Sequence, residues 1–169
     1  MNAEKPGPSA WDAALRLLGV RARSRSEVRE RLTRRGFDEV EIDGVLGRLD
    51  DAGLLDDAEF AHEWVQSRHR YSGRGRVALR RELRAKGIAE ETVAAALAEV
   101  DRDDEREQAL ELARKKLAQS KLDPTDYEQR AKAYRRLAGL LGRRGYPPEI
   151  ISSVVGDVLR AGADSPDLP

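Results

Sequence analysis

Apolar side chains recur every three or four residues along most of this chain, with charged side chains between them. Between residues 58 and 71, for example, Phe60, Ala61, Trp64 and Val65 follow this spacing. It is the period of an α-helix with one buried face, whereas a half-buried strand would alternate apolar and polar residues. No alternating run bounded by hairpin turns occurs in the sequence. The pattern therefore predicts an all-α protein.

Three segments share one apolar register when they are aligned on Gly36, Gly87 and Gly145. Apolar residues stand eight and four positions before each glycine, directly after it, and six and thirteen positions after it. These positions hold Val28, Leu79 and Leu137; Leu32, Leu83 and Leu141; Phe37, Ile88 and Tyr146; Ile42, Val93 and Ile151; and Leu49, Val100 and Val158. Because glycine readily takes the left-handed conformation that ends helices, each segment is predicted to be a basic helix, a glycine turn and a second helix.

A further helix is expected upstream of each pair, over residues 11–18, 58–71 and 105–117. The sequence thus predicts three tandem three-helix repeats forming an elongated, curved array, because units of about fifty residues bury too little apolar surface alone. We expect repeats at 10–53, 54–101 and 102–160, with disordered tails at 1–9 and 161–169. Capping boxes are expected at Asp56 with Glu59, and at Thr125 with Glu128 after the linker at 119–125.

Composition excludes several classes of protein. The chain has no cysteine, so a disulfide scaffold, a thiolate metal site and a cysteine nucleophile are excluded. Its two histidines, His62 and His69, are too few for a histidine-rich metal site. No apolar run approaches the length of a membrane span, and the first ten residues lack the features of a signal peptide. We expect a soluble, cytoplasmic protein with no membrane partner, no metal and no cofactor.

Charge is abundant but balanced, with 31 basic and 31 acidic residues. The second helix of each repeat is basic, and the third helix of the first two repeats is acidic. The helix macrodipole accounts for bases near helix ends. It does not account for Arg76, Arg80 and Arg84, which follow one helix flank with no acid at that spacing within the helix. These three side chains are predicted to face a binding partner rather than an intramolecular row of acids.

Gly73, Gly75 and Ala78 spell G-x-G-x-x-A, one form of the dinucleotide-binding fingerprint. That fingerprint binds pyrophosphate only where a strand runs into the glycines and a helix runs out. Here the preceding residues have helical spacing, so the glycines are predicted to join two helices. A nucleotide site is not expected.

An enzyme is a second possibility that the sequence allows us to weigh. Asp50, Asp51, Asp56 and Asp57, with Glu59, form a local acidic cluster that could hold Mg²⁺. Metal ligands must converge, however, and these acids stand where helix caps belong. No nucleophile has a base beside it in the pattern. The sequence therefore favours a protein that is not an enzyme.

Three stretches of the chain resemble the RecX regulatory proteins, modulators of the RecA recombinase: ALRLLGVRARSRSEVRERLTRRGF, VLGRLDDAGLLDDAEFAHEWVQSR and GRGRVALRRELRAKGI. The match spans roughly residues 10 to 159 and is loosest in the third unit. Its most specific part is the order and spacing of Leu54, Leu55, Asp56, Asp57, Phe60 and Ala61, followed by Gly75, Leu79, Leu83, Lys86, Gly87 and Ile88.

The resemblance implies a non-catalytic regulator in homologous recombination, DNA repair and the SOS response. Such a protein lies in the helical groove of a RecA filament on single-stranded DNA. There it inhibits filament extension, strand exchange, ATP hydrolysis and coprotease activity. We expect a monomer that binds bare DNA weakly and without sequence specificity. The candidate contact residues are Arg25, Arg29, Arg74, Arg76, Arg80, Arg81, Arg84, Lys86, Arg135, Arg136, Arg143 and Arg144.

The alternative is a helical protein that acts on naked DNA without RecA. Repeated helix-glycine-helix units invite a comparison with helix-turn-helix proteins, in which residues 74–86 would form the recognition helix. That segment offers only arginine and lysine, which chiefly bind phosphate, and none of the amides or hydroxyls that commonly read base edges. Sequence-specific binding is therefore not expected.

Overall fold

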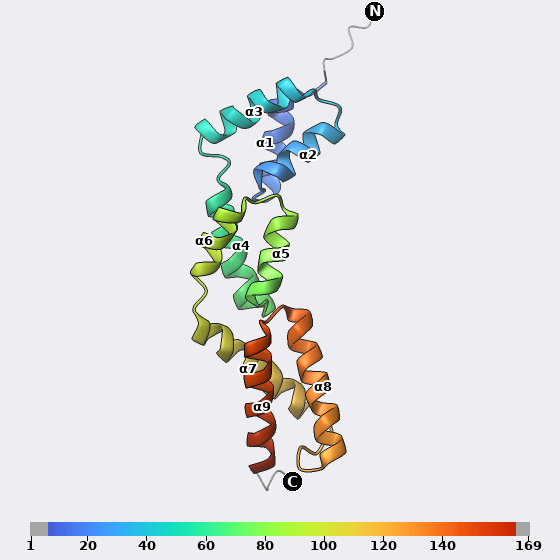
Figure 1. Ribbon diagram of the computed structural model, residues 1–169. Helices are drawn as coiled ribbons and strands as arrows, with labels where there is room; N and C mark the ends of the chain where they lie inside the picture. Colours follow the sequence, from blue (N-terminus) through green and yellow to red (C-terminus); the bar gives the residue numbers. More distant parts are fainter. Residues whose placement is uncertain (1–6, 165–169) are drawn as a thin grey trace, which may run out of the picture.

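A computed structural model describes residues 7–164, and this range contains nine helices and no strand. In chain order the helices are Ala10–Val20 (α1), Arg25–Arg34 (α2), Glu39–Asp51 (α3), Asp57–Ser72 (α4), Arg76–Ala85 (α5), Glu90–Ala98 (α6), Arg102–Ala118 (α7), Tyr127–Arg144 (α8) and Pro148–Asp164 (α9). They form three consecutive three-helix units that follow one another along a long axis (Figure 1). The prediction of an all-α, tandem-repeat fold is confirmed.

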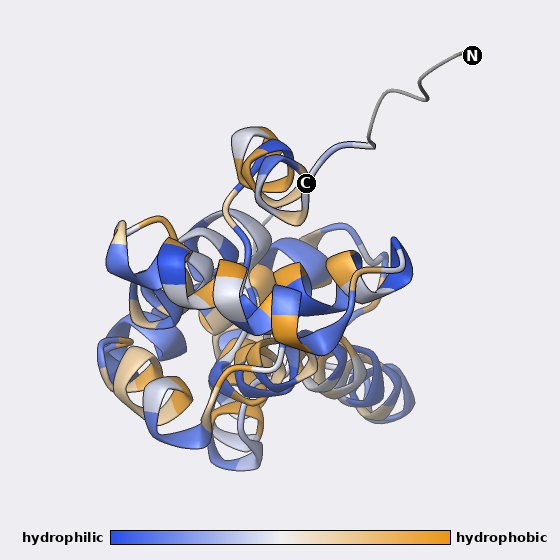
Figure 2. Cartoon of the chain, turned by 90° about the horizontal axis from the view of Figure 1, so that it is seen from above, coloured by the Kyte–Doolittle hydropathy of each residue, from blue (hydrophilic) through white to orange (hydrophobic). Residues whose placement is uncertain are grey.

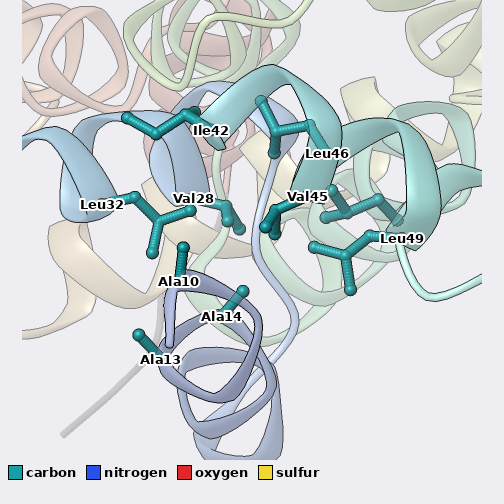
Figure 3. Packing of buried hydrophobic residues seen from close by; sticks show 10 residues of the cluster. Ala10, Ala13, Ala14, Val28, Leu32, Ile42, Val45, Leu46 and Leu49 are labelled. Carbon is teal, nitrogen blue, oxygen red and sulfur yellow. The ribbon is translucent and has the colours of Figure 1, made fainter. Parts of the chain in front are cut away.

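Each unit has a hydrophobic core of its own. The three buried clusters draw separately on α1–α3, α4–α6 and α7–α9. In the first cluster, Val28 and Leu32 of α2 and Leu46 of α3 converge on the alanines of α1 (Figure 3). Seen from above, the helices carry both hydrophobic and hydrophilic stretches (Figure 2), as expected where each buries only one face.

The apolar register predicted from the glycine alignment is confirmed in the structure. All of its positions are buried except Phe37 and Ile151, which are partly exposed and pack against the first and third cores. Gly36, Gly87 and Gly145 end α2, α5 and α8 with φ of +88°, +72° and +81°. Each repeat therefore buries equivalent residues of its second helix and turns at the same position.

Neither predicted capping box forms in full: the Asp56 cap is correct but no hydrogen bond returns to it from the Glu59 side chain, and the Thr125 cap is wrong. Asp56 does cap α4, accepting hydrogen bonds from the Ala58 and Glu59 amides at 2.9 and 3.0 Å. The N-cap of α8 is Asp126 rather than Thr125, and its carboxylate accepts from the Gln129 amide at 2.8 Å. The Thr125 hydroxyl donates instead to Asp123 at 2.6 Å. A carboxylate one residue closer to the helix thus outcompetes the hydroxyl as its cap.

The last helix continues to Asp164, four residues past the expected end of the third unit at 160. Gly162 lies against the linker, because a Cβ at this position would come 3.0 Å from Pro124 Cγ and 3.5 Å from Leu117 Cδ2. This packing extends the helix into the expected tail. Residues 1–6 and 165–169 lie outside the described part. Within residues 7–164, no helix has the length and apolar content needed to cross a membrane.

Candidate functional site

The three basic helices α2, α5 and α8 are joined end to end. The C-terminus of α5 meets the N-terminus of α2, where Ser24 Oγ donates a hydrogen bond to the Lys86 carbonyl at 2.6 Å. The C-terminus of α8 meets the N-terminus of α5 through two backbone bonds, from Gly75 N to Arg144 O at 2.9 Å and from Val77 N to Gly145 O at 3.0 Å. The electronegative end of one helix therefore caps the electropositive start of another.

The glycines of the G-x-G-x-x-A motif serve this joint. Helix α4 precedes them, so the prediction that they connect two helices is confirmed. A Cβ on Gly75 would lie 2.5 Å from the Gly145 carbonyl oxygen, and a Cβ on Gly145 would overlap the side chain and amide of Ala78. Gly87 stands in the same relation to Ser26 at the other joint. The glycines of the motif allow two backbones to approach closely, as small residues do in a nucleotide site. Here, however, the two backbones belong to packed helices and not to a nucleotide-binding loop.

An acid from the following unit completes each joint. Asp57 of α4 accepts a hydrogen bond from the Arg25 amide at 2.8 Å, and Glu105 of α7 accepts one from the Arg76 amide at 2.7 Å. Glu105 is only 1% exposed. Neither contact was predicted from the sequence. A signal existed only for Glu105, because Gly75 has no side chain with which to cap α5, whereas Ser24 caps α2 with its own side chain.

The prediction that Arg76, Arg80 and Arg84 have no intramolecular acid partners is wrong. Arg76 Nε lies 3.6 Å from Glu105 Oε2, and its guanidinium also donates to the Val100 carbonyl. Arg80 and Arg84 share Glu90, at 3.3 and 2.6 Å. The hydrogen bond from Arg84 holds the pKa of Glu90 below its usual value. The search for acids at helical spacing within α5 could not find these pairs, because Glu90 lies on α6 and Glu105 lies on α7.

The remaining basic candidates of the first two units are also engaged, except Arg81. Arg25 pairs with Asp50, and Arg29 pairs with Asp43. Arg74 lies 3.4 Å from Glu82 and also donates to the Arg143 carbonyl at 3.3 Å. Asp50, Asp56 and Asp57 belong to the acidic cluster that was considered as a possible Mg²⁺ site. In the structure Asp50 pairs with Arg25, whereas Asp56 and Asp57 accept hydrogen bonds from backbone amides at helix N-termini. Arg81 is exposed and has no ion pair among residues 7–164.

Lys86 belongs to a charged cluster at the first joint. Its ammonium lies 3.0 Å from Glu27 Oε1 and 4.2 Å from the centre of the Trp64 ring. Arg21 also pairs with Glu27, at 2.9 Å. Burial raises the pKa of Glu27, but hydrogen bonds from Arg21, Lys86 and the Ser24 amide outweigh it and lower that pKa to about 2. The cluster connects the first unit to the second and leaves Lys86 mostly covered.

The third unit is different, because five of its basic side chains gather around a hollow that no acid lines. Arg135, Arg136 and Arg143 are exposed, and none has an ion pair within the described range. They line an open hollow of about 580 Å³ together with Lys116 of α7 and Lys132 of α8, and no acidic residue lines it. Neither lysine is among the contact residues predicted from the sequence. Arg144 instead turns toward the joint and donates to the Ser72 carbonyl.

These features define a class of protein: an elongated array of three-helix repeats whose second helices form one column, with unpaired basic charge in its last unit. Three family models match the chain in the same order, namely RecX, first three-helix domain, over residues 10–49; RecX, second three-helix domain, over 56–97; and RecX, third three-helix domain, over 103–155. The chain belongs to the RecX family.

Curated relatives and solved structures agree with this assignment. "Regulatory protein RecX" of Amycolatopsis mediterranei (strain U-32) is 48% identical over 150 residues, which cover 88% of this chain and 83% of the relative. The protein of the same name from Mycolicibacterium smegmatis is 46% identical over 146 residues, covering 86% and 77%. The crystal structure of RecX from Lactobacillus salivarius has the same fold, with a TM-score of 0.75 at 22% identity, over 88% of this chain and 94% of that chain.

Proposed function

We propose that this protein regulates RecA by binding along the helical groove of the RecA filament on single-stranded DNA. It acts without catalysis. Bound there, it inhibits filament extension, strand exchange, ATP hydrolysis and coprotease activity. The family resemblance supplies the partner, and the molecule acts as a cytoplasmic monomer.

The observation that carries this proposal is the column of α2, α5 and α8. Tandem repeats present extended surfaces, and an extended surface suits a long periodic partner better than a compact one. The backbone bonds from Gly75 and Val77 across the second joint fix the two units relative to each other. A stiff array loses little conformational freedom on binding, so more of its contact energy appears as affinity.

The charge arrangement supports a surface made of both protein and DNA contacts. Most basic candidates in the first two units already pair with acids, and the whole chain has no net charge. Phosphate contacts from those units would therefore require breaking existing pairs. Among residues 7–164, the third unit offers a group of unpaired bases that line one common hollow. Because of this difference, we expect the first two units to contact RecA and the third unit to contact DNA.

Cosedimentation tests the proposal directly. The protein is titrated against RecA filaments preassembled on single-stranded DNA with a slowly hydrolysed ATP analogue, and in parallel against the same DNA alone. We expect at least a twentyfold preference for the filament, which needs only about 1.8 kcal/mol of added contact at roughly 1.4 kcal/mol per tenfold. Binding to the filament should also be less sensitive to salt, and RecA-dependent ATP hydrolysis should fall as the filament saturates.

A protein that acts on naked DNA without RecA is the second candidate, and the all-basic hollow is the observation that favours it. Affinity held by phosphate contacts alone falls with salt at a log-log slope of about −0.7 per phosphate on single strands. Equal affinity for bare DNA and filament, with the same slope, would establish this candidate and refute regulation through RecA.

A further inference from the structure

The basic hollow of the third unit is built on one flank of α8. Lys132, Arg136 and Arg143 are four and seven residues apart, so they lie above one another on the helix. Gly139 falls on the same flank between the two arginines. A Cβ there would come within 3.2 Å of the Arg143 guanidinium, so the glycine allows that side chain to lie close along the flank. Lys116 approaches from α7.

A second hollow of about 530 Å³ adjoins the first and shares Lys132 and Arg135 with it. It is lined mainly by apolar and neutral side chains, among them Leu122 and Gln129, with Glu128 as its one acid. Tyr127 also lines it, and this tyrosine is 85% exposed. An uncovered aromatic ring thus stands directly beside a hollow that is lined only by cations.

We propose that the third unit is a binding site for single-stranded nucleic acid, with phosphates in the basic hollow and a base stacked on Tyr127. The inference builds on the proposed function by assigning the DNA contact to this unit, as the strand within the filament. Single-strand sites combine basic grooves with aromatic platforms, which accept any base because every base has a flat face. A duplex keeps its bases stacked within itself and offers none to the tyrosine.

The charge pattern favours this ligand over an acidic protein surface. Acidic carboxylates would satisfy the cations but would leave the exposed ring without a partner. A single strand satisfies both, since its phosphates form a continuous line of charge and its bases are free to turn outward. Because no amide or hydroxyl lines the basic hollow, the phosphate contacts made there carry no sequence information.

The experiment measures fluorescence anisotropy of a labelled thymidine oligonucleotide of about 12 nucleotides, a length within known single-strand site sizes. The test variant is Lys132→Ala/Arg136→Ala/Arg143→Ala in the full chain. The matched control, Arg16→Ala/Arg31→Ala/Arg35→Ala, removes three exposed and unpaired arginines from the first unit. Circular dichroism melting of each variant verifies that it is folded.

Each phosphate contact on a single strand contributes about 0.7 decade of affinity per decade of salt. Three contacts therefore contribute about two decades between 0.1 and 1 M salt, and we expect the test variant to bind about 100-fold more weakly at 0.1 M. Its salt slope should be shallower by about 2. The control should change the slope by less than about 0.7, which is the value expected for a single phosphate contact. Equal losses in the two triple variants would overturn the assignment.

The tyrosine is tested separately. Tyr127→Ala should weaken binding about fivefold or more, which is the low end of base stacking, whereas Tyr127→Phe keeps the ring and should retain affinity. Tyr71→Ala is the control, since Tyr71 is 87% exposed at the end of α4. If Tyr127→Ala binds as the wild type does, and a glutamate-rich peptide of equal charge competes as well as the oligonucleotide, the hollow is a site for acidic protein and the inference fails.

These outcomes are separable from the failure of the proposed function. The oligonucleotide measurements contain no RecA, so they report on the third unit alone. Filament cosedimentation of the wild type reports on the proposed function alone. Wild-type inhibition of RecA together with undiminished oligonucleotide binding by the test variant would refute only the inference.

Discussion

Replacing Gly145 with alanine tests the joint between the second and third units. Gly145 has φ of +81°, and the added Cβ would overlap Ala78. The matched control is Gly36→Ala at the equivalent position of the first repeat, where φ is +88° but a Cβ would meet nothing within 4 Å. Both substitutions place alanine in the left-handed region, and only one of them disrupts a joint.

The magnitude follows from the two contacts at the joint. The left-handed conformation costs about 1 to 2 kcal/mol for a residue other than glycine, and this cost applies to both variants. Relief of the overlap at Gly145 separates the helices and breaks the bonds donated by the Gly75 and Val77 amides. A buried amide left without a partner costs about 1 to 3 kcal/mol. Gly75 is buried, whereas Val77 is 55% exposed and its amide can bond to water, so Gly145→Ala should destabilise by about 1 to 3 kcal/mol more than Gly36→Ala.

Urea denaturation followed by circular dichroism gives the free energies of unfolding. Hydrogen exchange with mass spectrometry adds a local readout, because the Gly75 and Val77 amides should exchange faster in Gly145→Ala and at the wild-type rate in Gly36→Ala. If the two variants lose equal stability and both amides stay protected, the joint does not depend on the glycine and the reasoning is refuted.

Four further substitutions test the core and the ion pairs. Leu83→Ala should lower the free energy of unfolding by about 2 to 5 kcal/mol in urea denaturation, because Leu83 is fully buried in the second core. Glu27 has a pKa of about 2 in the folded chain against 4.5 without these contacts, so the unfolded chain binds its proton more readily. Its contribution to stability is therefore complete above pH 4.5 and lost as the pH falls toward about 2, and Glu27→Gln should flatten this part of the stability profile. Arg76→Ala removes the charged partner of buried Glu105 and should cost about 3 kcal/mol or more. Arg80→Ala breaks an exposed pair and should lower the melting temperature much less. Equal thermal shifts in those two variants would contradict the difference in burial.

The repeat register was predictable from sequence because it depends on local rules. A glycine that ends a helix, with apolar residues at fixed distances on either side, places Leu32, Leu83 and Leu141 in equivalent buried sites. Helical period and the conformational freedom of glycine suffice for that inference. Phe37 is only partly buried because it lies at the outer end of the array, whereas Ile88 and Tyr146 lie at joints.

The charge network was not predictable in the same way. Glu90 and Glu105 neutralise arginines of α5 from the following helices, across turns whose geometry the sequence does not give. The row of basic residues on α5 therefore indicated an unpaired basic surface in the second unit. In the structure, acids from later helices pair with most of these residues. Lys116 and Arg143 are far apart in sequence, and only the packing of α7 against α8 brings them to one hollow.

The joint between units also explains how an array of this kind can grow and stop. It connects unlike ends, so it is heterologous, and a heterologous contact that does not close a ring can be repeated without limit. Copying a unit of about fifty residues copies both halves of the connector with it. Within residues 7–164 the column ends at the N-terminus of α8, which has 18 residues where α2 and α5 have 10 each, and which is capped by Asp126 without a joint to another helix. The chain is in effect a short directional polymer of one supersecondary unit, with a modified terminal subunit.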